Sequence, residues 1–193
     1  MSVGVLISGT GSNLQALIDD REIDVACVVS STPDAAGLAR AERAGIPELA
    51  TADESETAAF LDRHAVELVV LAGYMRVLSA EFVHRYSRRI INVHPSLLPA
   101  FPGAHAIRDA LDHGVRVTGV TVHLVDDDHV LADSGPIILQ ESLDVSYDDR
   151  PEDVTAGLHE IEHRLLPRAV RLFCAGLIEV EGRNVRVREE HLA

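Results

Sequence analysis

The chain has 193 residues, of which 47% are hydrophobic and 25% are charged. This length and usage are typical of one folded globular domain, and they exclude a disordered, collagen-like or fibrous protein. The 31 acidic residues outnumber the 17 basic ones, so the formal net charge is −14 with histidine neutral. Such a charge repels nucleic acid and anionic lipid, and we expect neither nucleic acid nor a membrane as a partner.

Residue usage also indicates a source and a compartment. No lysine occurs, so all 17 basic residues are arginine, which fits a GC-rich or salt-loving source. The two cysteines, Cys27 and Cys174, lie far apart and form no CxxC motif, which argues against a disulfide framework or structural zinc. The N-terminus lacks a basic segment, and the apolar runs are too short to cross a bilayer. We therefore expect a cytoplasmic protein.

Strand and helix patterns alternate through the first half of the chain. The expected strands cover residues 3–8, 25–30, 68–71 and 90–93, and the expected helices cover 14–18, 34–44, 54–64 and 80–86. The segment 73–78 is expected to be a loop. Strands that alternate with helices at this spacing predict crossover units and a mostly parallel sheet.

The pattern changes after Pro95, where prolines interrupt an irregular stretch. A helix is expected over 106–112, strands over 115–125 and 136–143, a long helix over 152–175 and a hairpin of 177–180 with 184–188. The near-strict alternation of 115–125 predicts an antiparallel strand with one wetter face. Pro167 is expected to kink or divide the long helix.

These patterns together predict an α/β fold. We expect a single doubly wound, mostly parallel, Rossmann-like sheet with an antiparallel C-terminal part and a long closing helix. The whole chain, 1–193, is expected to form one domain. Residues 1–95 would form a nucleotide-binding-like half, and residues 96–193 would complete the active site.

A glycine-rich loop, Gly9-Thr10-Gly11-Ser12-Asn13, joins the first expected strand to the first expected helix. A loop that feeds a helix N-terminus offers backbone N–H groups and a positive dipole end to an anion, so this loop is a candidate phosphate site. It matches neither GxGxxG nor the Walker pattern. The alternative is a plain strand-to-helix turn in which Ser12 is the N-cap.

Asn92 and His94 stand two positions apart at the C-terminal end of an expected strand, where open α/β sheets bind their ligands. An amide donor beside an imidazole suits the stabilisation of an oxyanion. Asp133 precedes Ser134-Gly135-Pro136 at another strand boundary and could hold His94 in position. The alternatives are a satisfied loop histidine, a strand-end asparagine and an ordinary turn aspartate.

The remaining histidines show no metal-binding spacing. His123 lies in the alternating strand and the others are scattered, so solvated or capping roles are favoured over metal ligation. The run Asp126-Asp127-Asp128 is interpreted as a solvated loop, with calcium binding as the weaker alternative, because no EF-hand spacing follows. We expect no metal.

Four runs in this order resemble the phosphoribosylglycinamide formyltransferase family, and the match extends from Val3 to about Arg171. They are LISGTGSNLQ at 6–15, LAGYMRVL at 71–78, NVHPSLLP at 92–99 and DSGPII at 133–138. The resemblance implies a doubly wound fold in which folate and substrate meet at the strand ends. It also implies transfer of a formyl group from 10-formyltetrahydrofolate to the amine of glycinamide ribonucleotide in de novo purine (IMP) biosynthesis.

The resemblance assigns roles to residues that match the family's motifs. The implied catalytic residues are Asn92, His94 and Asp133, the implied substrate-binding residues are Gly11, Ser12, Asn13, His159 and Glu162, and the implied pterin-pocket residues are Met75, Arg76, Val77, Leu78 and Asn92. Gly11, Ser12 and Asn13 would hold the phosphate. No metal is required, and the Leu98–Pro99 bond corresponds to a cis peptide in the family.

The chain departs from the family pattern in three places. His159 stands where many members have glutamine, and no basic residue occurs in 52–61, where relatives often place one near the folate tail. The loop from Asp126 to Asp133 is about three residues longer than usual. The expected partners are the two small molecules, glycinamide ribonucleotide and formylfolate, with the protein a monomer or a homodimer.

Other functions share parts of this pattern. Methionyl-tRNA formyltransferase has the same Asn-x-His-Pro run but needs a further domain and a basic surface for tRNA, which a net charge of −14 disfavours. Formyltetrahydrofolate hydrolase shares the catalytic residues but usually carries an extra N-terminal domain. The non-enzymatic alternative is a phosphometabolite-binding assembly subunit, which the intact Asn92, His94 and Asp133 disfavour.

Overall fold

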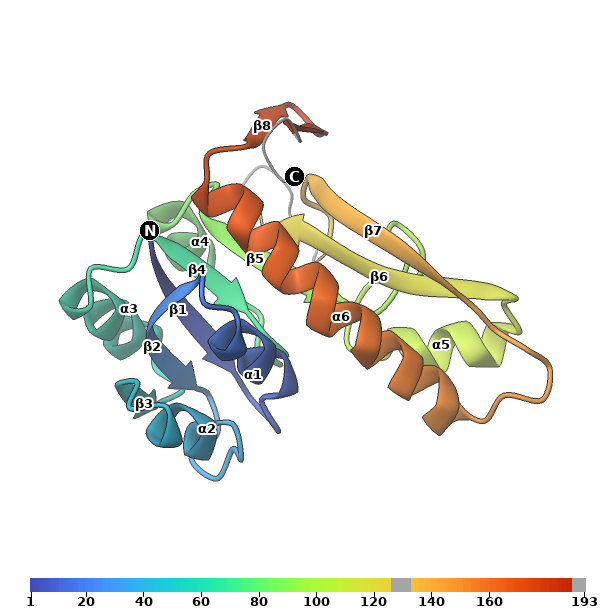
Figure 1. The fold of residues 1–193 in the computed structure, drawn as a ribbon, viewed down its shortest axis with the longest axis horizontal. Coiled ribbons are helices and arrows are strands. Elements are labelled where there is room, and N and C mark those ends of the chain that lie inside the picture. Colours follow the sequence, from blue (N-terminus) through green and yellow to red (C-terminus); the bar gives the residue numbers. More distant parts are fainter. Residues whose placement is uncertain (126–132, 189–193) are drawn as a thin grey trace. The chain divides into compact units, whose positions relative to one another are not determined.

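The computed structural model describes residues 1–125 and 133–188, and seven of its strands form one sheet in the order β3-β2-β1-β4-β5-β6-β7 (Figure 1). These strands are β1 (Ser2–Ile7), β2 (Asp24–Ser30), β3 (Glu48–Ala50), β4 (Leu68–Leu71), β5 (Ile90–His94), β6 (Val117–Leu124) and β7 (Ile137–Asp144). The pairs β1–β2, β1–β4, β2–β3 and β4–β5 are parallel, whereas β6–β7 is antiparallel. The predicted parallel sheet with an antiparallel C-terminal part is confirmed.

The chain divides within β5 into two units, Met1–Asn92 with Val125, and Val93–Leu124 with the described residues from Asp133 onward. That residues 1–193 form a single domain with halves 1–95 and 96–193 stays a prediction. The helices of the first unit are α1 (Ser12–Asp19), α2 (Leu38–Arg43), α3 (Glu54–Arg63) and α4 (Ala80–Arg85), and those of the second are α5 (Ala106–His113) and α6 (Pro151–Cys174).

The first unit owes its stability to strands that are buried on both faces, as is usual in parallel sheets. Leu6, Val69 and Leu71 pack in one hydrophobic cluster with Phe60 of α3 and Phe82 of α4. Residues of opposite parity along each strand point to the other face. There α1 buries its own apolar face, including Leu14 and Leu17, and contacts β2.

Two elements of the first unit differ from the sequence prediction. The short edge strand β3 was not predicted, because Glu48–Ala50 has no apolar run and is recognisable only through its pairing with β2. The helix expected over 34–44 is shorter and begins at Leu38. The backbone before Leu38 makes hydrogen bonds outside the helix. The Ala35 N–H donates to Thr32 O, and the Gly37 N–H donates to Gly9 O.

In the second unit α6 packs against β6 and β7 (Figure 1). The expectation that β6 has one wetter face is wrong, because every residue from Thr118 to Leu124 is buried. The face of β6 at Gly119 is covered so closely that a Cβ there would lie 2.6 Å from the Leu97 side chain and 2.2 Å from Glu141 O. Only glycine permits this approach. Burial alternates instead along β7, where partly buried and exposed residues follow one another from Leu139 to Asp144.

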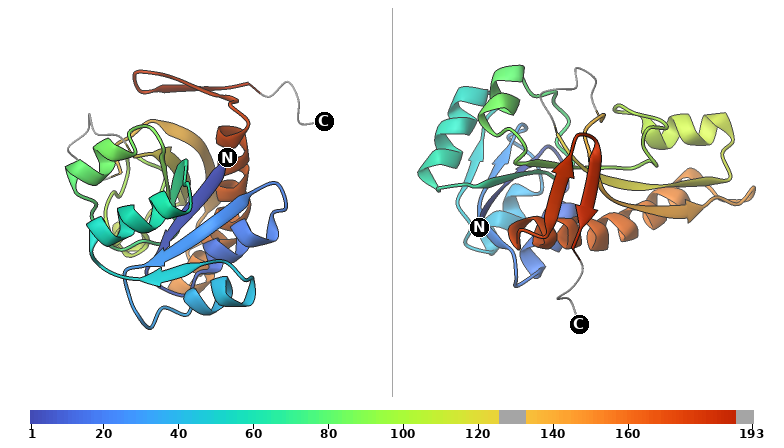
Figure 2. Two further views of the ribbon diagram at one scale, coloured as in Figure 1. Left: turned by 90° about the vertical axis from the view of Figure 1, so that its left-hand side faces the viewer. Right: turned by 90° about the horizontal axis from the view of Figure 1, so that it is seen from above.

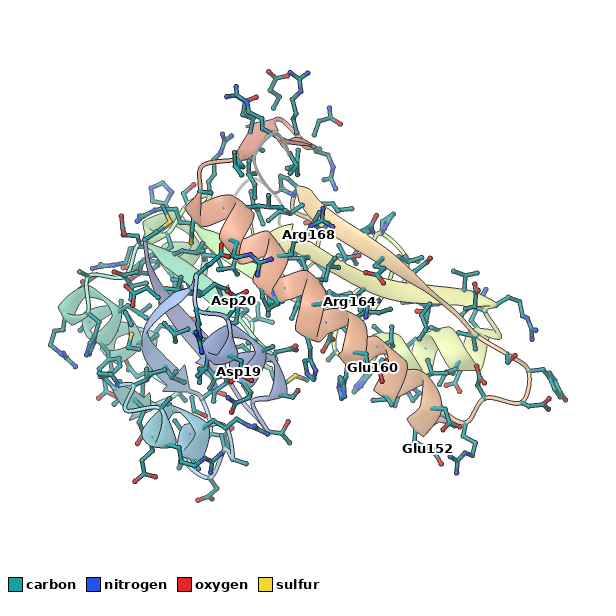
Figure 3. All side chains as sticks on the ribbon, in the orientation of Figure 1. Asp19, Asp20, Glu152, Glu160, Arg164 and Arg168 are labelled. Carbon is teal, nitrogen blue, oxygen red and sulfur yellow. The ribbon has the colours of Figure 1, made fainter. Side chains whose placement is uncertain are left out.

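Helix α6 runs without interruption through Pro167, so the proline does not divide it. Proline removes one helical hydrogen bond, but burial of residues such as Leu158, Leu165 and Leu166 along the same face compensates for the loss. Arg164, labelled midway along α6 in Figure 3, pairs with Glu141 of β7 and ties the helix to the sheet.

The predicted terminal hairpin is confirmed as β8 (Ile178–Glu181) and β9 (Asn184–Val187), two short antiparallel strands seen clearly in Figure 2. Its apolar residues pair across the strands, Ile178 with Val187 and Val180 with Val185. Both cysteines are free thiols, and burial raises the pKa of Cys27 to about 12. Within the described ranges, no helix is long and apolar enough to cross a membrane.

Candidate active site

The glycine loop of the first unit has the backbone geometry of an open helix N-terminus. Gly11 is the N-cap of α1 and adopts the left-handed conformation (φ 71°), and no side chain caps this end of the helix. A Cβ on Gly11 would lie 2.6 Å from Gly37 Cα, so both conformation and space demand glycine. Ser12 is the first helical residue, so the alternative in which it is the N-cap is wrong. The first N–H groups of a helix have no partner within it, which suits an anion.

The loop that carries Met75, Arg76, Val77 and Leu78 is held at both ends within the same unit. At its start the Met75 N–H donates to Ser8 Oγ at 2.8 Å, and Ser8 Oγ lies 2.7 Å from Ser31 Oγ. Between the two ends, the side chains of Met75 and Val77 are largely exposed, at 68% and 87%.

At the end of this loop, Glu54 accepts hydrogen bonds from the Ser79 N–H at 2.9 Å and from the Ser79 hydroxyl. Ser79 is also the N-cap of α4, where its hydroxyl accepts from the Phe82 N–H. The sequence patterns do not predict Ser8, Ser31 and Glu54 as site residues. The only signal in the sequence is that Ser8 is the last residue of the expected strand 3–8, directly before the glycine loop.

In the second unit, the structure brings together His94 and Asp133, which lie far apart in sequence. His94 is the last residue of β5 and is 5% exposed. Its Nδ1 lies 3.4 Å from Asp133 Oδ2. The other carboxylate oxygen, Oδ1, lies 3.6 Å from Nε2 of His123, a residue of β6 that is 1% exposed. One carboxylate is therefore flanked by two buried imidazoles.

His123 belongs to this cluster, and the prediction that it is solvated or caps an element is wrong, because its side chain is 1% exposed. The alternation of β6 contained a usable signal, because a histidine among buried apolar positions needs polar partners. Those partners are Leu124 O, 2.9 Å from its Nδ1, and Asp133.

The protonation of both rings follows from their carbonyl partners. His94 Nε2 lies 2.9 Å from Phe101 O, and a carbonyl oxygen only accepts, so Nε2 carries a proton. The same argument places a proton on Nδ1 of His123, which faces Leu124 O. The nitrogen that remains on each ring faces Asp133. It can donate to the carboxylate only when the ring is an imidazolium.

Asp133 is ionised in this setting. Burial acts to raise its pKa, but the hydrogen bond from His123, the Gly103 N–H at 2.8 Å, and the charges of His94 and His123 together lower it from 3.8 to about 2. Asp133 itself adopts a left-handed backbone conformation, with φ 58°. The cluster therefore contains a buried negative charge, and both imidazole rings face it.

A buried polar network supports the loop that follows His94. Thr121 Oγ1 donates to Ser96 O at 2.7 Å and accepts from the Leu98 N–H at 3.0 Å. Gln140 Nε2 donates to both Leu98 O and Thr121 Oγ1. The Leu98–Pro99 peptide is cis, as the resemblance implies. The network fixes the path of the chain from His94 to Phe101, whose carbonyl orients the His94 ring.

The other expected site residues have these positions. Asn92 lies in β5, two residues before His94, and is partly buried. His159 and Glu162 lie on α6, where Glu162 is buried and His159 stacks on His163 with ring centroids 6.2 Å apart. The structure leaves their roles as predictions.

The acidic run at Asp126, Asp127 and Asp128 and the rest of the loop up to residue 132 lie outside the described residues. The solvated-loop and calcium interpretations therefore stay untested. In the part of the chain that is described, no three His, Cys, Asp or Glu side chains are grouped so that they could hold a metal ion.

The sheet is Rossmann-like, an uncapped helix N-terminus follows β1, and a buried histidine–carboxylate cluster lies at the end of β5. These features are those of an α/β enzyme with candidate acid–base and anion-binding groups. Residues 1–170 match the model of the formyl transferase family, and the chain belongs to that family.

Relatives of the chain narrow this class. It is 41% identical to phosphoribosylglycinamide formyltransferase of Escherichia coli K12, over 93% of this chain and 90% of that protein. It is 42% identical to the trifunctional purine biosynthetic protein adenosine-3 of Gallus gallus over 93% of this chain, but spans only 19% of that protein. Glycinamide ribonucleotide transformylase 1 of Symbiobacterium toebii has the same fold, with a TM-score of 0.92, 44% identity, and coverage of 98% of this chain and 94% of that one.

Proposed function

We propose that this chain transfers the formyl group of 10-formyltetrahydrofolate to the amine of glycinamide ribonucleotide in purine biosynthesis. The observation that carries the proposal is the buried His94–Asp133 pair, with nitrogen and oxygen 3.4 Å apart, in a chain that matches the E. coli enzyme over 90% of its length. The partners are these two small molecules, and formylfolate acts as a co-substrate.

The chemistry requires a group that stabilises negative charge on the formyl oxygen. The amine nitrogen attacks the formyl carbon, which forms a C–N bond and a tetrahedral oxyanion. Collapse of this intermediate breaks the bond to the folate nitrogen, which takes up a proton while the amine loses one. Stabilisation of the oxyanion is the largest contribution that a protein makes to such acyl transfers.

Asn92 and His94 stabilise the oxyanion in different ways. The Asn92 amide donates a hydrogen bond. His94 acts chiefly through its positive charge, because Nε2 already faces Phe101 O and Nδ1 faces Asp133. That charge has a large effect because the ring is 5% exposed and is poorly screened by water.

Asp133 holds the His94 ring in place and presents a negative charge to its Nδ1. With a pKa of about 2 it is a weak base at neutral pH, so its contribution to the reaction is electrostatic. Transfer of the proton from the amine to the folate nitrogen then passes through water that the carboxylate orients.

The substrates are held by the remaining site residues. Gly11, Ser12 and Asn13 bind the phosphate at the start of α1, and His159 and Glu162 contact the ribonucleotide. Met75, Arg76, Val77, Leu78 and Asn92 line the pterin pocket. Because the Met75 N–H already donates to Ser8, the pterin is bound by other backbone groups of this loop.

Purified protein mixed with 10-formyltetrahydrofolate and candidate acceptors tests the proposal. Formylated glycinamide ribonucleotide and free tetrahydrofolate should appear in equal amounts, and the dephosphorylated riboside should be a poor acceptor. Release of free formate without an acceptor would instead indicate a hydrolase, and equal turnover of both acceptors would contradict the phosphate assignment.

A further inference from the structure

Arg40 is a cation that contacts the glycine loop and has no role in the site described so far. It lies on α2, and its Nε donates to Thr10 O at 2.9 Å, while Nη1 donates to Gln15 Oε1 at 3.2 Å. Gln15 is on α1 and in turn donates to Asp19, the last residue of that helix, labelled in Figure 3. The guanidinium thus joins the loop to the helix that follows it.

The start of α2 adds one hydrogen bond to the loop and approaches it closely. The Gly37 N–H donates to Gly9 O at 3.0 Å, and a Cβ on Gly11 would lie 3.4 Å from Arg40 Cδ. The carbonyls of two successive loop residues, Gly9 and Thr10, are therefore both turned toward α2. The donor to Gly9 O is the N–H of Gly37, the N-cap of α2, and the donor to Thr10 O is Arg40 of the same helix.

This arrangement determines where the loop directs its N–H groups. In a trans peptide the C=O and the following N–H point in opposite directions. Because Thr10 O faces Arg40, the Gly11 N–H points away from α2, and because Gly9 O faces Gly37, so does the Thr10 N–H. Backbone N–H groups directed outward from a loop are the donors that a phosphate needs.

Charge supports the same role. A phosphate monoester carries between one and two negative charges at neutral pH, and the net charge of this protein is −14. The segment from Gly9 to Gln15 contains no charged side chain. Arg40 places a positive charge on the loop itself, and hydrogen bonds from a charged donor are stronger than those from a neutral one.

We propose that Arg40 is a positioning residue that holds the glycine loop in its phosphate-binding shape and thereby sets the preference for a phosphorylated acceptor. This proposal rests on the proposed function. Arg40 acts through the loop, so its loss should weaken binding of the phosphorylated acceptor and leave the chemical step unchanged.

The test compares Arg40→Gln and Arg40→Lys with Arg43→Gln, an exposed arginine on the same helix whose loss changes the net charge equally. For each variant, kcat and KM are measured with glycinamide ribonucleotide and with its dephosphorylated riboside. Arg40→Gln should raise KM for the ribonucleotide by about tenfold or more, as expected for a charged hydrogen bond, and change kcat less than about twofold. The riboside and formylfolate constants should not change.

The lysine variant separates charge from geometry. Lysine keeps the charge, but its single ammonium group lacks the planar guanidinium with which Arg40 donates to both Thr10 O and Gln15 Oε1. Arg40→Lys should therefore recover only part of the affinity for the ribonucleotide that Arg40→Gln loses. If Arg40→Gln does not fold, Arg40→Lys tests the proposal by itself, and its KM for the ribonucleotide should rise several-fold. An unchanged preference for the phosphorylated acceptor, an equal loss for both acceptors, or the same loss in Arg43→Gln would overturn the proposal.

Direct titration of each variant with inorganic phosphate separates this proposal from the proposed function. Weaker phosphate binding in Arg40→Gln alone would support the role of Arg40 even if the wild-type protein formylates neither acceptor. Equal phosphate binding in wild type and Arg40→Gln would refute it even if the wild-type protein is fully active.

Discussion

Replacement of Asp133 by asparagine should remove a pH-dependent part of the stability of this protein. The hydrogen bonds and charges around Asp133 lower its pKa from 3.8 to about 2, and its side chain is 12% exposed. A difference of this size corresponds to about 2 kcal/mol of folding free energy at neutral pH.

The sign follows from the lowered pKa. The unfolded chain binds a proton at Asp133 near pH 3.8, whereas the folded chain does so only near pH 2. The stabilisation is therefore complete above about pH 4 to 5 and is lost as the pH falls toward about 2. Asp133→Asn lacks this contribution at every pH, so the stability gap between wild type and variant should narrow in acid.

Urea unfolding followed by circular dichroism measures this gap at neutral pH and at several values down to about pH 3. Asp148→Asn, an exposed aspartate of the same unit, is the matched control and should show little gap at any pH. A gap that is absent at neutral pH, or that stays constant between neutral pH and pH 3, would refute the account of the His94–Asp133–His123 cluster.

Two further predictions concern turnover and folate binding. His94→Ala should lower kcat on the order of a hundredfold or more. The His94→Ala/Asp133→Asn double variant should have a kcat little lower than that of the poorer single variant, because the two residues act as a unit. Near-wild-type kcat in a folded His94→Ala protein would contradict the mechanism. Ser8→Ala should raise KM for formylfolate several-fold with little change in kcat, because it removes the acceptor for the Met75 N–H. Ser8→Thr, which keeps the hydroxyl, should restore most of the affinity, and an unchanged folate KM in Ser8→Ala would show that the loop does not need this bond.

The sequence by itself determined the local elements of this protein and the residue types of its chemistry. Apolar periodicity is a property of neighbouring residues, so β4 was predicted at Leu68–Leu71 and the other long elements to within a few residues. The order of motifs around Asn92, His94 and Asp133 was sufficient to indicate the formyl transferase family. Residues 1–170 match the model of that family.

The tertiary structure decided which side chains meet. Arg40 reaches Thr10 across 30 positions, and Met75 reaches Ser8 across 67, and no local pattern records either contact. His123 looked like a surface histidine because alternation in β6 resembles a half-wet strand, and only the packing of the second unit shows that both faces are covered. The physical reason is that periodicity reports which way a side chain points along its own strand or helix, whereas burial and hydrogen-bond partners are set by segments that fold against it from elsewhere in the chain.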